Sequence, residues 1–149
     1  MDIGIWQGPR GLLLKTLAAA FPQGNYLLRP EKCDICVSNG PLPDSEAPCE
    51  CKTAVIPGDT PVDCRFLRAG RIVTYGLSGG NTVALSSAGG GNLLLSLQRE
   101  IMAFGGRRVE RQEVLLRNAA PTASAMAAAA ALIVSGAEPE TLENAWREK

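Results

Sequence analysis

The residues whose types and spacing could do chemistry fall into two groups, a glycine-rich turn near the amino terminus and a set of cysteines. The turn reads Gly4-Ile5-Trp6-Gln7-Gly8-Pro9-Arg10-Gly11. A strand that leads through glycines into a helix forms an anion site, because backbone N–H groups and the helix dipole point at the ligand. A P-loop needs lysine directly after its last glycine, then serine or threonine for magnesium. Pro9 and Arg10 follow Gly8 instead, and proline removes one N–H, so we do not expect catalytic ATP binding.

Two interpretations of this turn remain open. It is a plain strand-to-helix connection whose glycines serve tight geometry, or it keeps a site for a small anionic ligand. In the second case Gly8, Arg10 and Gly11 would line the site together with Asp59, which follows a later apolar run. Open α/β sheets bind ligands at the carboxyl ends of their strands, where these residues would meet.

The cysteines form the second group, with Cys33-x-x-Cys36, Cys49-x-Cys51 and Cys64. Four thiolates can hold a structural zinc ion, which makes Cys33, Cys36, Cys49 and Cys51 an alternative metal site. Zinc knuckles place Cys-x-x-Cys in a tight turn, whereas residues 33–37 are typical of a strand, where Cys33 and Cys36 would point to opposite faces. Cys49 and Cys51 would share one face and could meet Cys33. The pattern favours ordinary thiols and no bound metal, with zinc binding and a redox role as alternatives.

Composition excludes several classes of function. The sequence has no histidine, so no mechanism can use imidazole as a base, an acid or a metal ligand. Fifteen basic and fifteen acidic residues cancel among the 149 residues, which argues against electrostatic binding to nucleic acid or to anionic membranes. The amino terminus lacks the pattern of a secretory signal, and the alanine-rich stretch 119–137 is interrupted by polar residues and proline. We therefore expect a cytoplasmic protein with reduced thiols.

Short apolar runs bounded by proline and glycine define the elements that must position these groups. They predict strands at Asp2–Trp6, Asn25–Arg29, Cys33–Ser38, Thr53–Ile56 and Arg71–Tyr75, a helix at Leu12–Phe21, and polar connections at 42–50 and 60–70. Runs that are apolar on both faces are typical of parallel strands covered on both sides. The expected fold class is α/β, with a mostly parallel Rossmann-like sheet, flanking helices and a small antiparallel layer.

The second half of the chain has a different pattern of apolar and polar residues. Alternating residues between glycine pairs predict an antiparallel meander over 78–118, followed by two helices at Thr122–Ser135 and Glu140–Glu148. Gly136 is expected to cap the first of these helices and Pro139 to open the second. The local arginines 107, 108, 111 and 117 are interpreted as a solvated strand face. We expect a single domain over 1–149, with the parallel part at 1–77 and the helical tail at 119–149.

Four segments of the chain follow a recognisable order: Val55–Pro61, Arg71–Leu77, Asn81–Val83 and Ala123–Leu142. Together they resemble the last part of the central domain of Mur ligases, the ATP-dependent amide ligases of peptidoglycan precursor synthesis. In that family a strand ends in an Asn-Ala-Asp-Asp-Pro-like turn that meets the nucleotide, and an alanine-rich helix follows an antiparallel layer. The resemblance covers about two thirds of the chain and follows the order of elements more than strict motifs.

The resemblance implies that the residues of ligase chemistry are missing. Gly8 would match the last glycine of the family's ATP loop, but Pro9 stands for its lysine and Arg10 for its threonine. Pro57 replaces the asparagine of the nucleotide turn and Thr60 its second acid, while Asp59 and Pro61 match. Ala120-Pro121 stand where the family often has His-Asn, and the portion with the magnesium ligands is shortened away.

The sequence therefore predicts a non-catalytic Mur-ligase-like domain that acts as a binding or scaffolding module, possessing no cofactor. Its partner would be another protein, and a link to cell-wall metabolism and a homo-oligomeric state are compatible with this hypothesis. The alternative is a domain that binds a nucleotide, phosphate or sugar nucleotide through the degenerate glycine loop. An enzyme of another kind would need carboxylates, lysine, cysteine or tyrosine as its acid–base groups. No two of these residues are spaced in the sequence in a way that indicates a catalytic acid–base pair.

Overall fold

One mostly parallel sheet organises the protein in the computed structural model, which describes residues 1–6, 12–40, 49–59, 67–119, 123–138 and 142–143. The sheet has eight strands in the order β10-β7-β6-β5-β4-β3-β1-β2. All pairings from β2 to β6 are parallel, and β6–β7 and β7–β10 are antiparallel. The strands are β1 (Asp2–Trp6), β2 (Asn25–Leu28), β3 (Lys32–Ser38), β4 (Cys49–Pro57), β5 (Leu67–Gly76), β6 (Val83–Gly89), β7 (Asn92–Leu97) and β10 (Gln112–Leu116).

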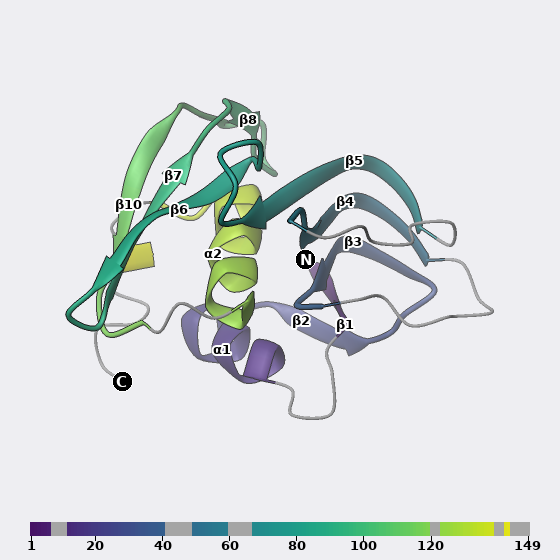
Figure 1. The fold of residues 1–149 in the computed structure, drawn as a ribbon. Helices are drawn as coiled ribbons and strands as arrows, with labels where there is room; N and C mark the ends of the chain where they lie inside the picture. Colours follow the sequence, from purple (N-terminus) through teal and green to yellow (C-terminus); the bar gives the residue numbers. More distant parts are fainter. Residues whose placement is uncertain (7–11, 41–48, 60–66, 120–122, 139–141, 144–149) are drawn as a thin grey trace.

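The smaller elements complete the predicted α/β class. Strands β8 (Ile101–Met102) and β9 (Arg108–Val109) form a separate antiparallel pair. The described residues also include two helices, α1 (Leu12–Ala20) and α2 (Ala123–Ser135). The antiparallel strands β6, β7 and β10 continue the main sheet and curve around α2 as a side wing (Figure 1).

The apolar runs located most elements, and the errors lie at their polar ends. The predicted strand 2–6 and the helices 12–21 and 122–135 agree with β1, α1 and α2 to within a residue. The connections predicted at 42–50 and 60–70 were too long, because Cys49 and Glu50 belong to β4 and residues 67–70 belong to β5. The meander predicted over 78–118 contains β6, β7, β8, β9 and β10. The predicted helix 140–148 lies outside the described residues except for positions 142 and 143.

Helix α2 is the centre of the main core. Eleven of its thirteen residues are buried, Ser124 to Val134, and the short alanine side chains let α1, the parallel strands and the wing pack closely around it. Gly136, at φ 96°, ends the helix as predicted, and the Ala137 N–H donates to the Leu132 carbonyl at 3.0 Å. The alanine-rich stretch is thus a buried helix, and none of the described helices is long and apolar enough to cross a membrane.

Arg107 has a more specific role than the solvated face predicted for it. Its guanidinium donates to the carbonyls of Gly136 and Ala137 at 3.1 Å and pairs with Glu138 at 2.6 Å. It therefore closes the carboxyl end of α2, where a positive charge also complements the helix dipole. Arg108, Arg111 and Arg117 are exposed, as the prediction had them.

Two separate apolar clusters lie on the two faces of the parallel sheet. The first contains both helices together with Ile5, Val37, Val55 and Val73. The second contains no residue of either helix and is built from Trp6, Cys33, Cys36, Cys49, Cys51, Ala54 and Ile56, with Leu67 and Ala69 packed against it. The described helices therefore cover one face, and the cysteines gather on the other.

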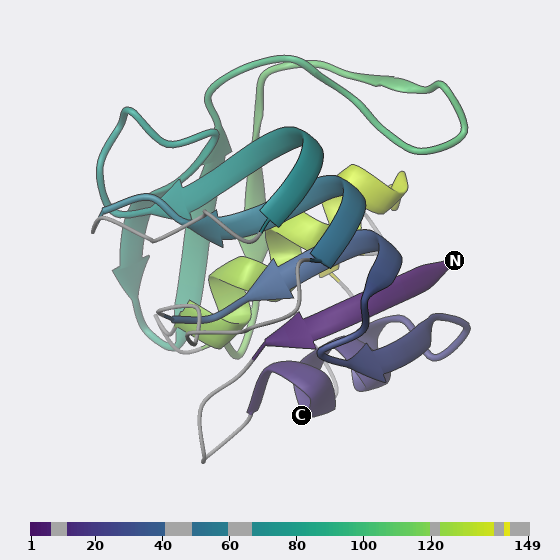
Figure 2. The ribbon, with the colours of Figure 1, turned by 90° about the vertical axis from the view of Figure 1, so that its right-hand side faces the viewer.

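The three central strands bend at the same level. Cys33, Cys51 and Ala69 are aligned across β3, β4 and β5, and Ile35, Thr53 and Arg71 form the next aligned row. In a regular strand, residues three apart point to opposite faces. Cys33 and Cys36 are three apart but belong to the same cluster, so the alternation of faces shifts by one residue between these rows on β3 and β4. Figures 1 and 2 show the three strands as arches. At this level Gly70 lies so close to β4 that an added Cβ would be 2.9 Å from the Lys52 carbonyl oxygen.

Candidate functional site

The residues predicted for the anion site divide into two sets. Gly8, Arg10 and Gly11 lie outside the described residues, as does Cys64. Strand β1 ends at Trp6 and α1 begins at Leu12, so the predicted strand and helix on either side of the glycine turn are confirmed. Asp59, the fourth predicted residue, is described and lies just beyond the carboxyl end of β4.

Asp59 closes the loop that joins β5 to β6. Its Oδ2 accepts the Leu77 N–H at 2.6 Å, and its Oδ1 accepts the Ser78 N–H at 3.0 Å and the Asn81 amide at 2.9 Å. These donors, with the two backbone N–H groups first, hold the pKa of Asp59 below its ordinary value of 3.8. The carboxylate predicted to face a ligand thus binds its own chain.

Two further side-chain contacts tie the carboxyl edge of the sheet together. The buried Tyr75 hydroxyl of β5 donates to the Ser38 carbonyl at the end of β3, at 2.6 Å, passing over β4. The Asn39 amide donates to the Ser124 hydroxyl in the first turn of α2 at 3.1 Å. The described part of this edge is therefore occupied by internal hydrogen bonds.

Four cysteine side chains converge on the concave side of the bend, and we call them the thiol cluster: Cys33, Cys36, Cys49 and Cys51. All four are buried and free. The prediction that Cys33 and Cys36 point to opposite faces was wrong, because the bend between them turns both thiols to the same side. Cys49 and Cys51 do share a face as predicted, and the Cys49 Sγ lies 3.9 Å from the Cys33 Sγ.

The Cys49 thiol contacts each of the other three thiols of the cluster. It forms side-chain hydrogen bonds with Cys33, Cys36 and Cys51, which hold the pKa of Cys49 far below its ordinary value. The same contacts, followed by burial, raise the pKa of Cys33 and Cys36. For Cys51 the contact with Cys36 lowers the pKa, but the contact with Cys49 and burial raise it more, to about 11. Because these shifts arise from the thiols' contacts with one another, the four groups titrate together and not one by one.

Backbone and aromatic donors surround the sulfur atoms. The Gly4 N–H donates to the Cys33 sulfur and the Cys36 N–H to the Cys51 sulfur, and each contact lowers the pKa of the thiol that accepts it. The indole Nε1 of Trp6, in the same cluster, is buried and has no hydrogen-bond partner among the described groups. The backbone N–H groups of Gly4 and Cys36 thus favour negative charge on Cys33 and Cys51.

Gly4 is a site residue that the sequence argument assigned only to a strand. A Cβ at this position would lie 2.9 Å from the Cys33 Sγ and 2.7 Å from Cζ3 of Trp6. Only glycine leaves room here for both the thiol and the indole. A glycine inside an otherwise apolar strand was the available signal, since it marks the close approach of another group. Trp6 itself is a core residue, 3% exposed.

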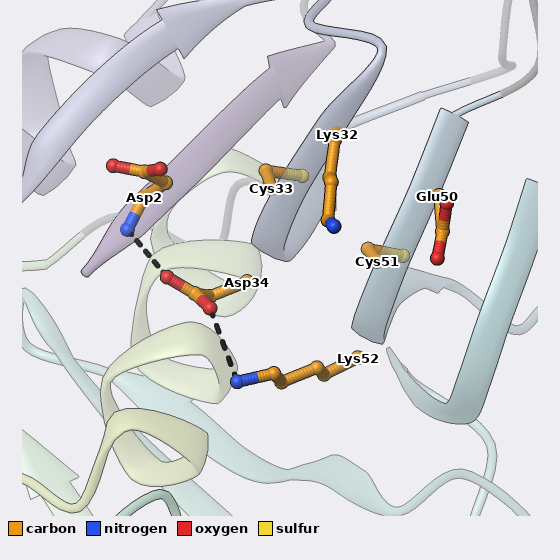
Figure 3. Close-up of a pocket in the computed structure, with 7 residues that line it drawn as sticks. All are labelled: Asp2, Lys32, Cys33, Asp34, Glu50, Cys51 and Lys52. Atoms are coloured by element: carbon orange, nitrogen blue, oxygen red, sulfur yellow. Dashed lines mark hydrogen bonds and ion pairs between the residues drawn. The ribbon is translucent and has the colours of Figure 1, made fainter.

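A pocket of about 400 Å³ opens beside the thiol cluster at the amino ends of β1, β3 and β4. Its lining comprises Asp2, Lys32, Cys33, Asp34, Glu50, Cys51 and Lys52. Figure 3 shows Asp34 between Asp2 and Lys52, with an N–H···O bond of 2.8 Å to the Asp2 nitrogen and an ion pair of 3.5 Å to Lys52. The Asp2 N–H holds the pKa of Asp34 below its ordinary value. The lining carries three carboxylates and two ammonium groups, and the amino-terminal ammonium also acts on Asp34, so charges of both signs surround the approach to the thiols.

The cluster offers two kinds of chemistry, coordination of a thiophilic metal and formation of a disulfide. As their side chains are placed, no three histidine, cysteine, aspartate or glutamate residues in the described ranges have the spacing that could hold a metal ion. The closest sulfur pair, Cys33 and Cys49, is also 3.9 Å apart, well beyond the 2.0 Å of a disulfide. Either reaction therefore needs side-chain movement within the cluster.

Comparison with known proteins adds no assignment. The chain matches no protein-family model, and no curated protein shows significant similarity to it.

Proposed function

We propose that the chain is a non-catalytic binding module with a Mur-ligase-like order of elements. The observation that carries this proposal is the bonding of Asp59, the acid that matches the family's nucleotide turn. A carboxylate has about four acceptor sites, and Asp59 uses three of them for Leu77, Ser78 and Asn81. An acid bound in this way holds the β5–β6 loop and is poorly placed to orient a nucleotide.

The order of elements supports the same proposal. Parallel strands, antiparallel strands and then a buried alanine-rich helix follow one another as the resemblance implies. Pro9, Arg10 and Pro57 stand where ligase chemistry would need other residues. Without that chemistry, the role left to such a domain is to bind, in the cytoplasm and in connection with cell-wall metabolism.

A protein partner would meet the sheet at one of its edges. Strands β2 and β10 are the outermost strands, and an outer strand offers unpaired backbone groups to another chain. Leu28 at the end of β2 is 65% exposed, which adds an apolar contact on that side. The same edge is available to a second copy of the chain.

A second candidate function is the binding of a small anionic ligand such as a nucleotide, phosphate or sugar nucleotide. The observation in its favour is that β1 ends at Trp6 and α1 begins at Leu12. Gly8, Arg10 and Gly11 thus belong to a segment that connects the carboxyl end of a parallel strand to a helix amino terminus, where anions bind.

ATP hydrolysis and thermal unfolding with ligands test both candidates together. We would measure hydrolysis of Mg-ATP and melting curves with Mg-ATP, inorganic phosphate and a uridine-diphosphate sugar, for the wild type, Arg10→Ala and Arg111→Ala. Arg111 is exposed and serves as the matched loss of one charge. A ligand at one hundred times its dissociation constant would stabilise the fold by about 2.7 kcal/mol, a shift of several degrees.

The outcomes separate the two functions. The binding-module proposal expects no hydrolysis and no shift in melting temperature with any of the three ligands. A shift that Arg10→Ala removes and Arg111→Ala keeps would establish the anion site instead. Turnover of ATP by the wild type and by Arg111→Ala that Arg10→Ala abolishes would refute the proposal of a non-catalytic module.

A further inference from the structure

We propose that the thiol cluster is a binding site for a thiophilic metal ion of the Zn²⁺ class, held by Cys33, Cys36, Cys49 and Cys51. This inference does not depend on the proposed function, since it concerns the opposite end of the strands from the glycine turn and the Asp59 loop. It starts from the convergence of four buried thiols from two neighbouring strands.

The separation of the two closest thiols suits a tetrahedral thiolate site. Zn–S bonds of about 2.3 Å place neighbouring sulfur atoms of a tetrahedron about 3.8 Å apart. Cys33 and Cys49 already have this separation, at 3.9 Å, and Cys36 forms side-chain contacts with both Cys49 and Cys51. As placed, the four sulfur atoms do not enclose a metal position, so binding requires rotation of side chains within the cluster.

Strand register argues against a disulfide between the two closest thiols. Cys33 is aligned with Cys51 on β4, so Cys49 is displaced along that strand by two residues. A rise of about 3.3 Å per residue and a strand separation of about 4.8 Å put the Cα atoms of Cys33 and Cys49 about 8 Å apart. A disulfide cannot span more than about 7 Å between Cα atoms without backbone movement. A metal ion that lies between the two sulfur atoms and bonds to both does not require the Cα atoms to come that close.

The surroundings supply what metal-bound thiolates need. N–H groups of Gly4 and Cys36 already donate to the sulfur atoms of Cys33 and Cys51, and hydrogen bonds of this kind stabilise ligand charge and fix ligand orientation. The Trp6 indole N–H is buried in the cluster without a partner among the described groups. A negatively charged sulfur within reach of this N–H would give it an acceptor among the described groups.

The same residues determine how Zn²⁺ would bind and how it would reach the cluster. One Zn²⁺ replaces the protons of the thiols, so that up to four protons are released to solvent as the Zn–S bonds form, and affinity falls as pH decreases. Cys33 and Cys51 line the pocket at the amino ends of the strands. That pocket is therefore the route by which a metal ion would reach the cluster.

Metal content of the full chain tests the proposal. The wild type, Cys49→Ser and Cys64→Ser would be produced with zinc supplied, dialysed and measured by plasma mass spectrometry. We expect about one Zn²⁺ per chain in the wild type and in Cys64→Ser, and at least a tenfold lower content in Cys49→Ser. Cys64 is the matched control because it lies outside the four-residue set.

A second measurement covers the case in which Cys49→Ser does not fold. Wild-type protein stripped of metal under reducing conditions would be titrated with Co²⁺, and a sulfur-to-cobalt charge-transfer band that saturates near one equivalent would support the site. The proposal is overturned if the zinc-supplied wild type holds less than a tenth of an equivalent and develops no such band. It is equally overturned if Cys64→Ser loses the metal, or if peptide mapping of the protein finds Cys33 joined to Cys49 or Cys51 by a disulfide.

Discussion

The hydrogen bond from Tyr75 to Ser38 allows a quantitative prediction about the carboxyl edge of the sheet. Tyr75 is 1% exposed and its hydroxyl lies 2.6 Å from the Ser38 carbonyl oxygen. Tyr75→Phe keeps the ring in the core, so no cavity opens, and removes only the hydroxyl. The loss leaves a buried carbonyl without this donor, which costs about 1–3 kcal/mol. For a chain of 149 residues that corresponds to a fall in melting temperature of about 3–10 °C.

Urea unfolding followed by circular dichroism would measure this loss. Tyr26→Phe is the matched control, because the Tyr26 hydroxyl also bonds to backbone carbonyls, of Phe21 at 2.6 Å and Leu17 at 3.0 Å, but belongs to a half-buried side chain. Water can replace it there, so the control should lose less than about 1 kcal/mol. The slope of the free energy against urea should be unchanged in both variants. If Tyr75→Phe is no less stable than Tyr26→Phe, the hydroxyl bridge does not stabilise this edge and the reasoning fails.

Three further predictions concern single side chains. Asp59→Asn should lower the free energy of unfolding by about 1 kcal/mol at neutral pH. Because the folded pKa of Asp59 lies below 3.8, this contribution is present above that pH and is lost below it. Urea denaturation curves of the variant and the wild type should therefore converge on acidification, and a constant gap between them would contradict this. Gly4→Ala should cost about 1–3 kcal/mol, since its Cβ would meet Cys33 and Trp6, whereas Gly79→Ala, with open space around it, should be near neutral in the same urea assay. Arg107→Ala should lower stability by about 0.5–1.5 kcal/mol through the end of α2, and an equal loss in the exposed control Arg111→Ala would show that charge alone is responsible.

Local sequence was enough to locate most of the elements. Strand β1 and helix α2 are continuous apolar runs ended by glycine or proline, and burial on every side selects for such runs. The missed beginnings of β4 and β5 are polar on alternate positions, as in Cys49-Glu50-Cys51-Lys52. That alternation is itself a strand signal, but the preceding proline-bearing segment favoured a loop.

The candidate site could be predicted only in part, because its geometry depends on neighbouring strands. The sequence was enough to nominate the four cysteines as a candidate site and to predict that Cys49 and Cys51 share one face of a strand. The convergence of Cys33 with Cys36 was not, since the rule of alternating faces holds for a regular strand and the bend changes it. Nothing within residues 33–36 marks the bend; it follows from the aligned rows on β4 and β5 and from the room that Gly70 leaves for the Lys52 carbonyl.

The bend also explains why the chemistry of this protein is expected away from the usual place. Open α/β sheets bind ligands at the carboxyl ends of their strands, yet the described carboxyl edge is tied by Asp59 and Tyr75 to its own backbone. Curving β3 and β4 toward the face without a described helix brings four thiols together there instead. A flat sheet would have turned Cys33 toward the helices, with Ile35. The bend that interrupts strand alternation is therefore also what assembles the thiol cluster.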